Sequence, residues 1–155
     1  MGVRRAYDGW VEGDVLDPEA AAVLAYLDRL ADARPELADP LAAHIDRYGV
    51  VTSTISLGRG SELFLQAGDG WDRVSWACPS GRVHEWTWHE RATPDDLDAL
   101  LAGRGVERTA WLGSRLAGSR LVVNDRTLAT SEGKLRLAVL RRLGIRTRER
   151  DEPAL

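Results

Sequence analysis

Apolar residues recur at helical spacing near the start of the chain. Val23, Leu27 and Leu30 stand at positions i, i+4 and i+7, after an Asp-Pro-Glu sequence that is typical of a helix start. A proline follows directly after Arg34 and should stop the helix. The pattern therefore predicts a helix over residues 17–34, preceded by an N-terminal arm at residues 1–16.

A second Asp-Pro pair, at residues 39–40, repeats the start signal. Leu41, Ile45 and Tyr48 follow it, again at i, i+4 and i+7, and Gly49 is placed as a left-handed terminator. We therefore expect two N-terminal helices that pack together.

From residue 49 onward the hydrophobic period becomes two, which predicts strands. Glycine-containing turn signals at residues 58–60, 69–70 and 79–81 divide this stretch. The predicted strands cover residues 51–57, 63–67, 74–78 and 84–88. They form a four-stranded antiparallel meander.

The alternation assigns each side chain of this meander to one of two faces. The apolar face should pack against the two N-terminal helices and consists of Val51, Ile55, Leu57, Leu63, Leu65, Val74, Trp76, Trp86 and Trp88. The other face should be open to solvent and consists of Thr52, Thr54, Ser56, Glu62, Phe64, Gln66, Arg73, Ser75, Val83, Glu85, Thr87 and His89.

The last third of the chain gives a mixed signal. Thr93-Pro94-Asp95-Asp96 opens a helix that ends near Gly103, and Thr130 or Ser131 caps a last helix through Leu143. Residues 106–130 fit either strands or a helix, and that choice stays open. The fold class predicted is one α+β domain over residues 1–155: the meander packed on one face by N-terminal helices, additional C-terminal helices and a tail at residues 145–155.

Composition limits the class of protein. The chain has 155 residues, a length that suits one domain. Its 21 basic residues include a single lysine, a bias that suggests a high-GC bacterial source. One cysteine excludes an internal disulfide framework, and the longest apolar run, residues 20–27, is too short to span a bilayer. These features predict a cytoplasmic protein with no membrane segment.

Cys78 and His84 are the sharpest candidates for chemistry. Hairpin pairing makes them diagonal neighbours on the apolar face, with Cα atoms about 7–8 Å apart, marginal for a thiol hydrogen-bonded to an imidazole. A lone buried cysteine is typically inert. His84 and His89 should point to opposite faces, and Glu85 and His89 lie about 13 Å apart along their strand. The sequence thus predicts no catalytic residues, no metal site and no cofactor.

Charge is distributed unevenly along the chain. Residues 1–47 hold 10 acids and 5 bases, whereas residues 108–150 hold 11 bases and 3 acids. The basic segment suits either a phosphate-bearing or acidic partner, or pairing with acids of the same chain.

These features favour a non-catalytic protein-interaction protein, such as a small inhibitor, an immunity-like factor or an assembly subunit. Another protein is the expected partner. One alternative is a nucleic-acid-binding accessory protein that uses the arginine-rich C-terminal segment, and another is a small ligand-binding protein or enzyme that uses the open sheet face. The predicted partner-binding residues are Phe64, Trp71, Arg73, Glu85, His89, Arg141, Arg142, Arg146 and Arg148.

Overall fold

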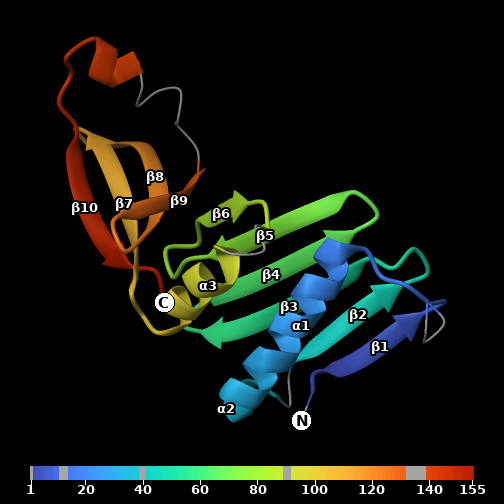
Figure 1. Ribbon diagram of the computed structural model, residues 1–155. Coiled ribbons are helices and arrows are strands. Elements are labelled where there is room, and N and C mark those ends of the chain that lie inside the picture. The colour runs from blue at the N-terminus through green and yellow to red at the C-terminus, as the bar shows by residue number, and fades with distance from the viewer. Residues whose placement is uncertain (1, 11–13, 39–40, 89–91, 132–138) are drawn as a thin grey trace.

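The computed structural model describes residues 2–10, 14–38, 41–88, 92–131 and 139–155, and in them ten strands form two sheets (Figure 1). The six-stranded sheet consists of β1 (Arg4–Asp8), β2 (Ala42–Asp46), β3 (Val51–Gly58), β4 (Ser61–Gly68), β5 (Trp71–Ala77) and β6 (Val83–Trp86). The four-stranded sheet consists of β7 (Gly105–Leu112), β8 (Arg115–Val123), β9 (Arg126–Ser131) and β10 (Arg148–Pro153). The named helices are α1 (Pro18–Ala33), α2 (Pro35–Ala38) and α3 (Thr93–Leu101), and the described residues 139–142 are also helical.

The four predicted strands are present as β3 to β6, and they pair in the predicted antiparallel order. The register is also as expected, with Trp76 opposite His84. Asp69 and Gly70 both have positive φ, at 50° and 79°, which is the backbone of a type I′ hairpin turn. Local turn chemistry therefore fixed the pairing of β4 with β5.

The predicted fold class is wrong beyond its α+β character, because a four-stranded meander with paired N-terminal helices is not what forms. The second predicted helix is strand β2, which pairs with β3. Leu41 just before the strand and Ala43 and Ile45 within it are buried, a period of two, whereas Tyr48 is exposed. The apolar residues of this stretch fit both periods, and pairing with β3 selected the strand.

The N-terminal arm contains β1, an edge strand that runs parallel to β2. All five of its residues are exposed, so it carries no hydrophobic alternation that a sequence pattern would reveal. Asp28 on α1 accepts hydrogen bonds from the Val3 backbone N–H (2.8 Å) and from Arg5 (2.9 Å). The strand is thus held by its ladder to β2 and by a carboxylate on the helix that follows it.

The predicted first helix is confirmed as α1, which lies across one face of the six-stranded sheet (Figure 1). Its buried side chains pack over β3 and β4. Each fully buried leucine, such as Leu27, contributes roughly 1.5–3 kcal/mol relative to exposure. None of the described helices has the length and hydropathy needed to cross a membrane.

Residues 106–130, left open by the sequence, belong to the second sheet, whose strand order is β10-β7-β8-β9. The predicted cap of the last helix is wrong, because Thr130 and Ser131 are strand residues paired with β8. Residues 132–138 of that prediction lie outside the described residues, and residues 139–142 are helical. The predicted helix at residue 93 is confirmed as α3.

The two sheets share one hydrophobic core. Leu121 and Val123 of the second sheet belong to the same buried cluster as Trp76 of the first. The Trp76 indole N–H donates to the backbone carbonyl of Ala154, 2.8 Å away, just after β10. Strands β6 and β9 also lie against each other. The inner face of the six-stranded sheet is therefore covered by α1 over one part and by α3 and the second sheet over the other.

Candidate functional site

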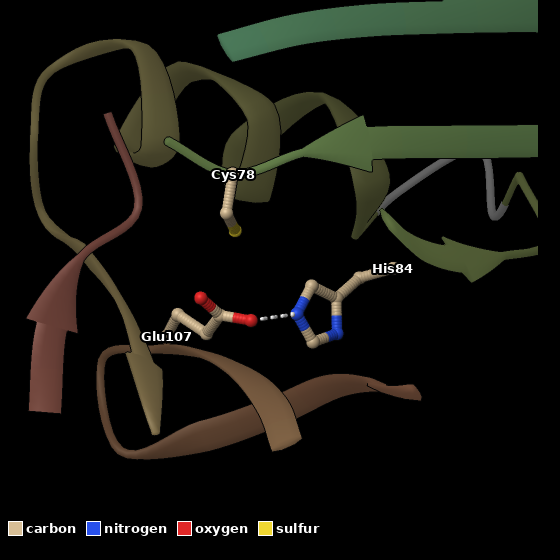
Figure 2. A group of neighbouring side chains, drawn as sticks. All are labelled: Cys78, His84 and Glu107. Carbon is tan, nitrogen blue, oxygen red and sulfur yellow. Dashed lines mark hydrogen bonds and ion pairs between the residues drawn. The ribbon is translucent and has the colours of Figure 1, made fainter. Parts of the chain in front are cut away.

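Three side chains of different chemistry meet where the two sheets join (Figure 2). Cys78 follows β5, His84 lies on β6 and Glu107 lies on β7. One potential ligand atom from each, a sulfur, an imidazole nitrogen and a carboxylate oxygen, lies within 4.8 Å of the other two. All three residues are at most 1% exposed. The junction therefore buries a thiol, an imidazole and an acid together.

The β5–β6 turn brings Cys78 and His84 to the same side. The Gly81 N–H donates to the Cys78 carbonyl (2.8 Å), and the Cys78 N–H donates to the Arg82 carbonyl (2.9 Å). This closes the turn at residues 78–82 and leaves His84 two residues further along, opposite Trp76. Figure 2 shows the Cys78 sulfur pointing toward the hydrogen-bonded pair of His84 and Glu107.

Glu107 is the centre of the polar contacts. His84 Nε2 donates to its Oε1 at 3.0 Å, while Ser80 Oγ (2.5 Å) and Arg82 Nη1 (3.3 Å) donate to Oε2. Burial by itself would raise the pKa of Glu107, but the hydrogen bonds from Ser80 and His84 and the charge of Arg82 hold that pKa below its usual value. Glu107 is therefore a buried carboxylate that three donors from one hairpin keep ionised.

Cys78 is not activated as a nucleophile. Burial, and next the charge of Glu107, raise the pKa of its thiol to about 12, which Arg82 only partly opposes. A protonated thiol attacks substrates poorly. The prediction that Cys78 and His84 share the buried face is confirmed, since both are 0% exposed.

A cleft of about 490 Å³ lies next to the buried cluster. Its walls come from the β3–β4 turn, the β5–β6 turn and the end of the chain, and they include Arg59, Ser80, Arg150, Glu152 and Leu155. Ser80 is exposed, yet its hydroxyl reaches Glu107. One side chain therefore connects the cleft with the buried carboxylate.

Three of the predicted partner-binding residues come together on the uncovered face of the six-stranded sheet. Arg73 forms an ion pair with Glu85, and its guanidinium lies 5.7 Å from the centroid of the Phe64 ring. The Ser75 hydroxyl donates to Glu85 at 3.0 Å. The hydrogen bonds of Arg73 and Ser75 hold the pKa of Glu85 below its usual value, against a smaller opposing effect of burial. Trp71 lies two residues before Arg73 on β5 and is 54% exposed.

The remaining predicted residues lie elsewhere. His89 is outside the described residues. Arg141, Arg142 and Arg146 are exposed in the segment that leads into β10, and Arg148 is the exposed first residue of β10, so all four belong to the second sheet's part of the chain and not to the strands of Phe64 and Arg73. Arg141 approaches Glu149 of β10 at 3.6 Å. Acids of β10 also pair with Arg108, Arg120 and Arg150, so part of the basic C-terminal charge is matched within its own sheet.

Sequence reasoning missed Glu107 completely. Glu107 alternates with Val106 and Arg108 in its strand, and polarity alone would place Val106 inside and the acid outside. The structure has the opposite arrangement, with Glu107 1% exposed and Val106 partly exposed. The donors that make this burial tolerable come from residues 80–84, 23 to 27 positions earlier. No local pattern carries that information.

Comparison of the chain with protein-family models, curated proteins and solved structures found no match.

Proposed function

We propose that this protein is a protein-interaction module, and that the uncovered face of the six-stranded sheet binds its partner. The observation that carries the proposal is the arrangement of Phe64, Arg73 and Glu85, in which an aromatic ring and an ion pair are held together on an exposed face. Aromatic and arginine side chains are the residues most enriched at binding hot spots.

The size of this face supports the proposal. Neighbouring strands lie about 4.8 Å apart, so six strands span roughly 24 Å. A protein interface of standard size covers about 800 Å² on each partner, which a face of this breadth approaches. Thr54, Ser56 and Glu62 are exposed on it and surround the Phe64 ring with groups that form hydrogen bonds.

The fixed position of the Arg73 side chain also supports the proposal. Fixing a long side chain on binding costs about 0.5–1.5 kcal/mol. Arg73 already has partners on two sides, Glu85 and the face of Phe64. A partner that docks on this face would therefore meet an arginine whose position is largely set.

The burial of Cys78 supports a binding function for this protein and argues against catalysis by a cysteine nucleophile. Cys78 is 0% exposed, and burial raises the pKa of its thiol to about 12. A substrate would have to displace core side chains to reach it.

The basic segment supports a nucleic-acid partner less well, because Glu149 and Asp151 pair with arginines of the same sheet.

Site-specific photo-crosslinking tests the proposal. A photoreactive amino acid placed at Thr54 should crosslink the full-length protein to another protein in cells of its natural source. Thr54→Arg should weaken binding of the protein so identified at least tenfold. Thr127→Arg is the matched control, because Thr127 is also an exposed strand threonine but lies in the other sheet, on β9. Crosslinks that form from position 127 instead, or crosslinks to nucleic acid with salt-sensitive binding, would contradict the proposal.

A further inference from the structure

We propose that Cys78, His84 and Glu107 form a binding site for one divalent metal ion, with Zn²⁺ as the expected occupant, and that the ion joins the two sheets. The donor set selects the class of metal. Zinc is bound in proteins by cysteine sulfur, histidine nitrogen and carboxylate oxygen. Calcium and magnesium take oxygen donors and would leave the thiol and the imidazole unused.

The spacing of the donor atoms suits a small ion. Donors on a tetrahedral zinc ion with ordinary bond lengths lie about 3.3–3.7 Å apart. His84 Nε2 and Glu107 Oε1 are 3.0 Å apart, and all three donor atoms fall within 4.8 Å of one another. Binding would therefore require a small opening of the His84–Glu107 contact and an approach of the sulfur by at most about 1.5 Å, through rotation of the Cys78 and Glu107 side chains.

The charges balance when the ion binds. The Cys78 thiol gives up its proton to solvent, and the resulting thiolate and the Glu107 carboxylate together offset the 2+ charge of the ion. The His84 proton moves from Nε2 to Nδ1, which has no hydrogen-bond partner among the described residues. The protonated Nδ1 is then a buried donor that takes a water molecule as its acceptor, and one proton is released for each ion bound.

The neighbouring side chains supply a fourth position and a route of entry. Ser80 Oγ already contacts Glu107 Oε2 and lies in the wall of the 490 Å³ cleft. An ion can reach Glu107 from the cleft by passing this hydroxyl, and a water molecule from the cleft can complete a tetrahedral set. Arg82 keeps its contact to the second carboxylate oxygen and thereby orients the ligand.

Removal of the sulfur separates this proposal from a purely hydrogen-bonded cluster. Glu107 takes its hydrogen bonds from Ser80, Arg82 and His84, and no hydrogen bond of the Cys78 thiol is present among the described residues. Cys78→Ala therefore leaves the polar network in place and removes one metal ligand. His44→Gln is the matched control, because His44 is exposed on β2 and would account for adventitious binding by a surface imidazole.

Titration of the full metal-free chain with Zn²⁺ against a chelating dye, and separately with Co²⁺, tests the site. We expect one Zn²⁺ per chain with a Kd in the micromolar range or tighter, at least tenfold weaker binding by Cys78→Ala, and no change in His44→Gln. Co²⁺ should give a thiolate-to-cobalt charge-transfer band in the wild-type protein that Cys78→Ala lacks. Absence of this band from the folded wild-type protein overturns the proposal whether or not a variant folds. Equal Zn²⁺ affinity of folded wild type and folded Cys78→Ala also overturns it.

Discussion

His84 and Glu107 connect the two sheets through a fully buried hydrogen bond, with 3.0 Å between Nε2 and Oε1. The other two donors to Glu107, Ser80 and Arg82, come from the same β5–β6 segment as His84. One carboxylate on β7 therefore fixes the position of a whole hairpin of the other sheet. A buried acid is tolerated at this junction because both of its carboxylate oxygens accept hydrogen bonds from polar or charged donors.

Glu107→Ala should lower the free energy of unfolding by about 3–5 kcal/mol, because it removes a buried side chain and leaves the buried His84, together with Ser80 and Arg82 nearer the surface, without an acceptor. Urea unfolding measures the loss. Glu149→Ala is the control: Glu149 also pairs with an arginine, Arg120, but it is exposed, so its removal should cost less than about 1 kcal/mol. Similar costs for the two variants would show that the buried contacts do not hold the sheets together.

The elements that could be predicted from sequence are those whose signals are local. Helix α1 has its own start signal and apolar spacing, and β4 and β5 are joined by a turn that the Asp69-Gly70 pair specifies. The edge strand β1 has only exposed residues, and its position depends on pairing with β2, which is 38 residues further along. Strands of this kind are fixed by tertiary contacts and leave no periodic pattern.

The candidate site likewise contains residues whose positions follow from local pairing and one residue, Glu107, whose position does not. The common face of Cys78 and His84 followed from hairpin register, and so did the common face of Phe64, Arg73 and Glu85. Glu107 could not be found, because its burial depends on donors from another sheet. The hydrophobic pattern describes one sheet at a time, whereas this cluster exists only where two sheets meet.

Gly68→Ala should destabilise the protein by roughly 2–4 kcal/mol, as expected when both backbone strain and overpacking are introduced. Gly68 has φ +109°, and a Cβ there would lie 2.7 Å from the Gly49 carbonyl oxygen, a backbone atom that cannot rotate away. Gly58→Ala is the control, because Gly58 has φ +82° but open space around it, and it should cost only about 1 kcal/mol. Thermal unfolding compares them, and equal costs would mean that strain alone matters.

Trp76→Phe should cost about 1–3 kcal/mol. It removes the indole N–H that donates to the Ala154 carbonyl and leaves a buried acceptor without a partner. It also leaves unfilled volume in the core, since Trp76 is 0% exposed. Trp71→Phe makes the same chemical change at a side chain that is 54% exposed, and should change stability by no more than about 0.5 kcal/mol. Unfolding in urea distinguishes the two, and a neutral Trp76→Phe would show that the C-terminal contact is dispensable.

Asp151 should titrate below its usual pH range. The hydrogen bond from Arg108, with a smaller opposing effect of burial, lowers the pKa of Asp151 from its ordinary value of 3.8. Because the folded pKa is the lower one, the pair's contribution to stability is present above the unfolded pKa and is lost as the pH falls through the folded pKa. Carbon-detected NMR titration measures this pKa directly. Arg108→Ala should return it toward 3.8, and an unchanged value would show that the pair does not persist in solution.

Cys78 of the metal-free protein should react with thiol reagents only when the protein opens. The thiol is 0% exposed and burial raises its pKa to about 12, so at pH 8 only about one molecule in ten thousand carries a thiolate. Labelling with an aromatic disulfide in native buffer should therefore be slow and should accelerate with denaturant until one thiol per chain reacts. Ser56→Cys combined with Cys78→Ala is the control, because residue 56 is exposed on the open face and its thiol should label within minutes. If wild-type protein labelled as fast as this control, the junction would have to open to solvent in the native state, and the buried carboxylate would then lose the dry surroundings that make its three hydrogen bonds strong.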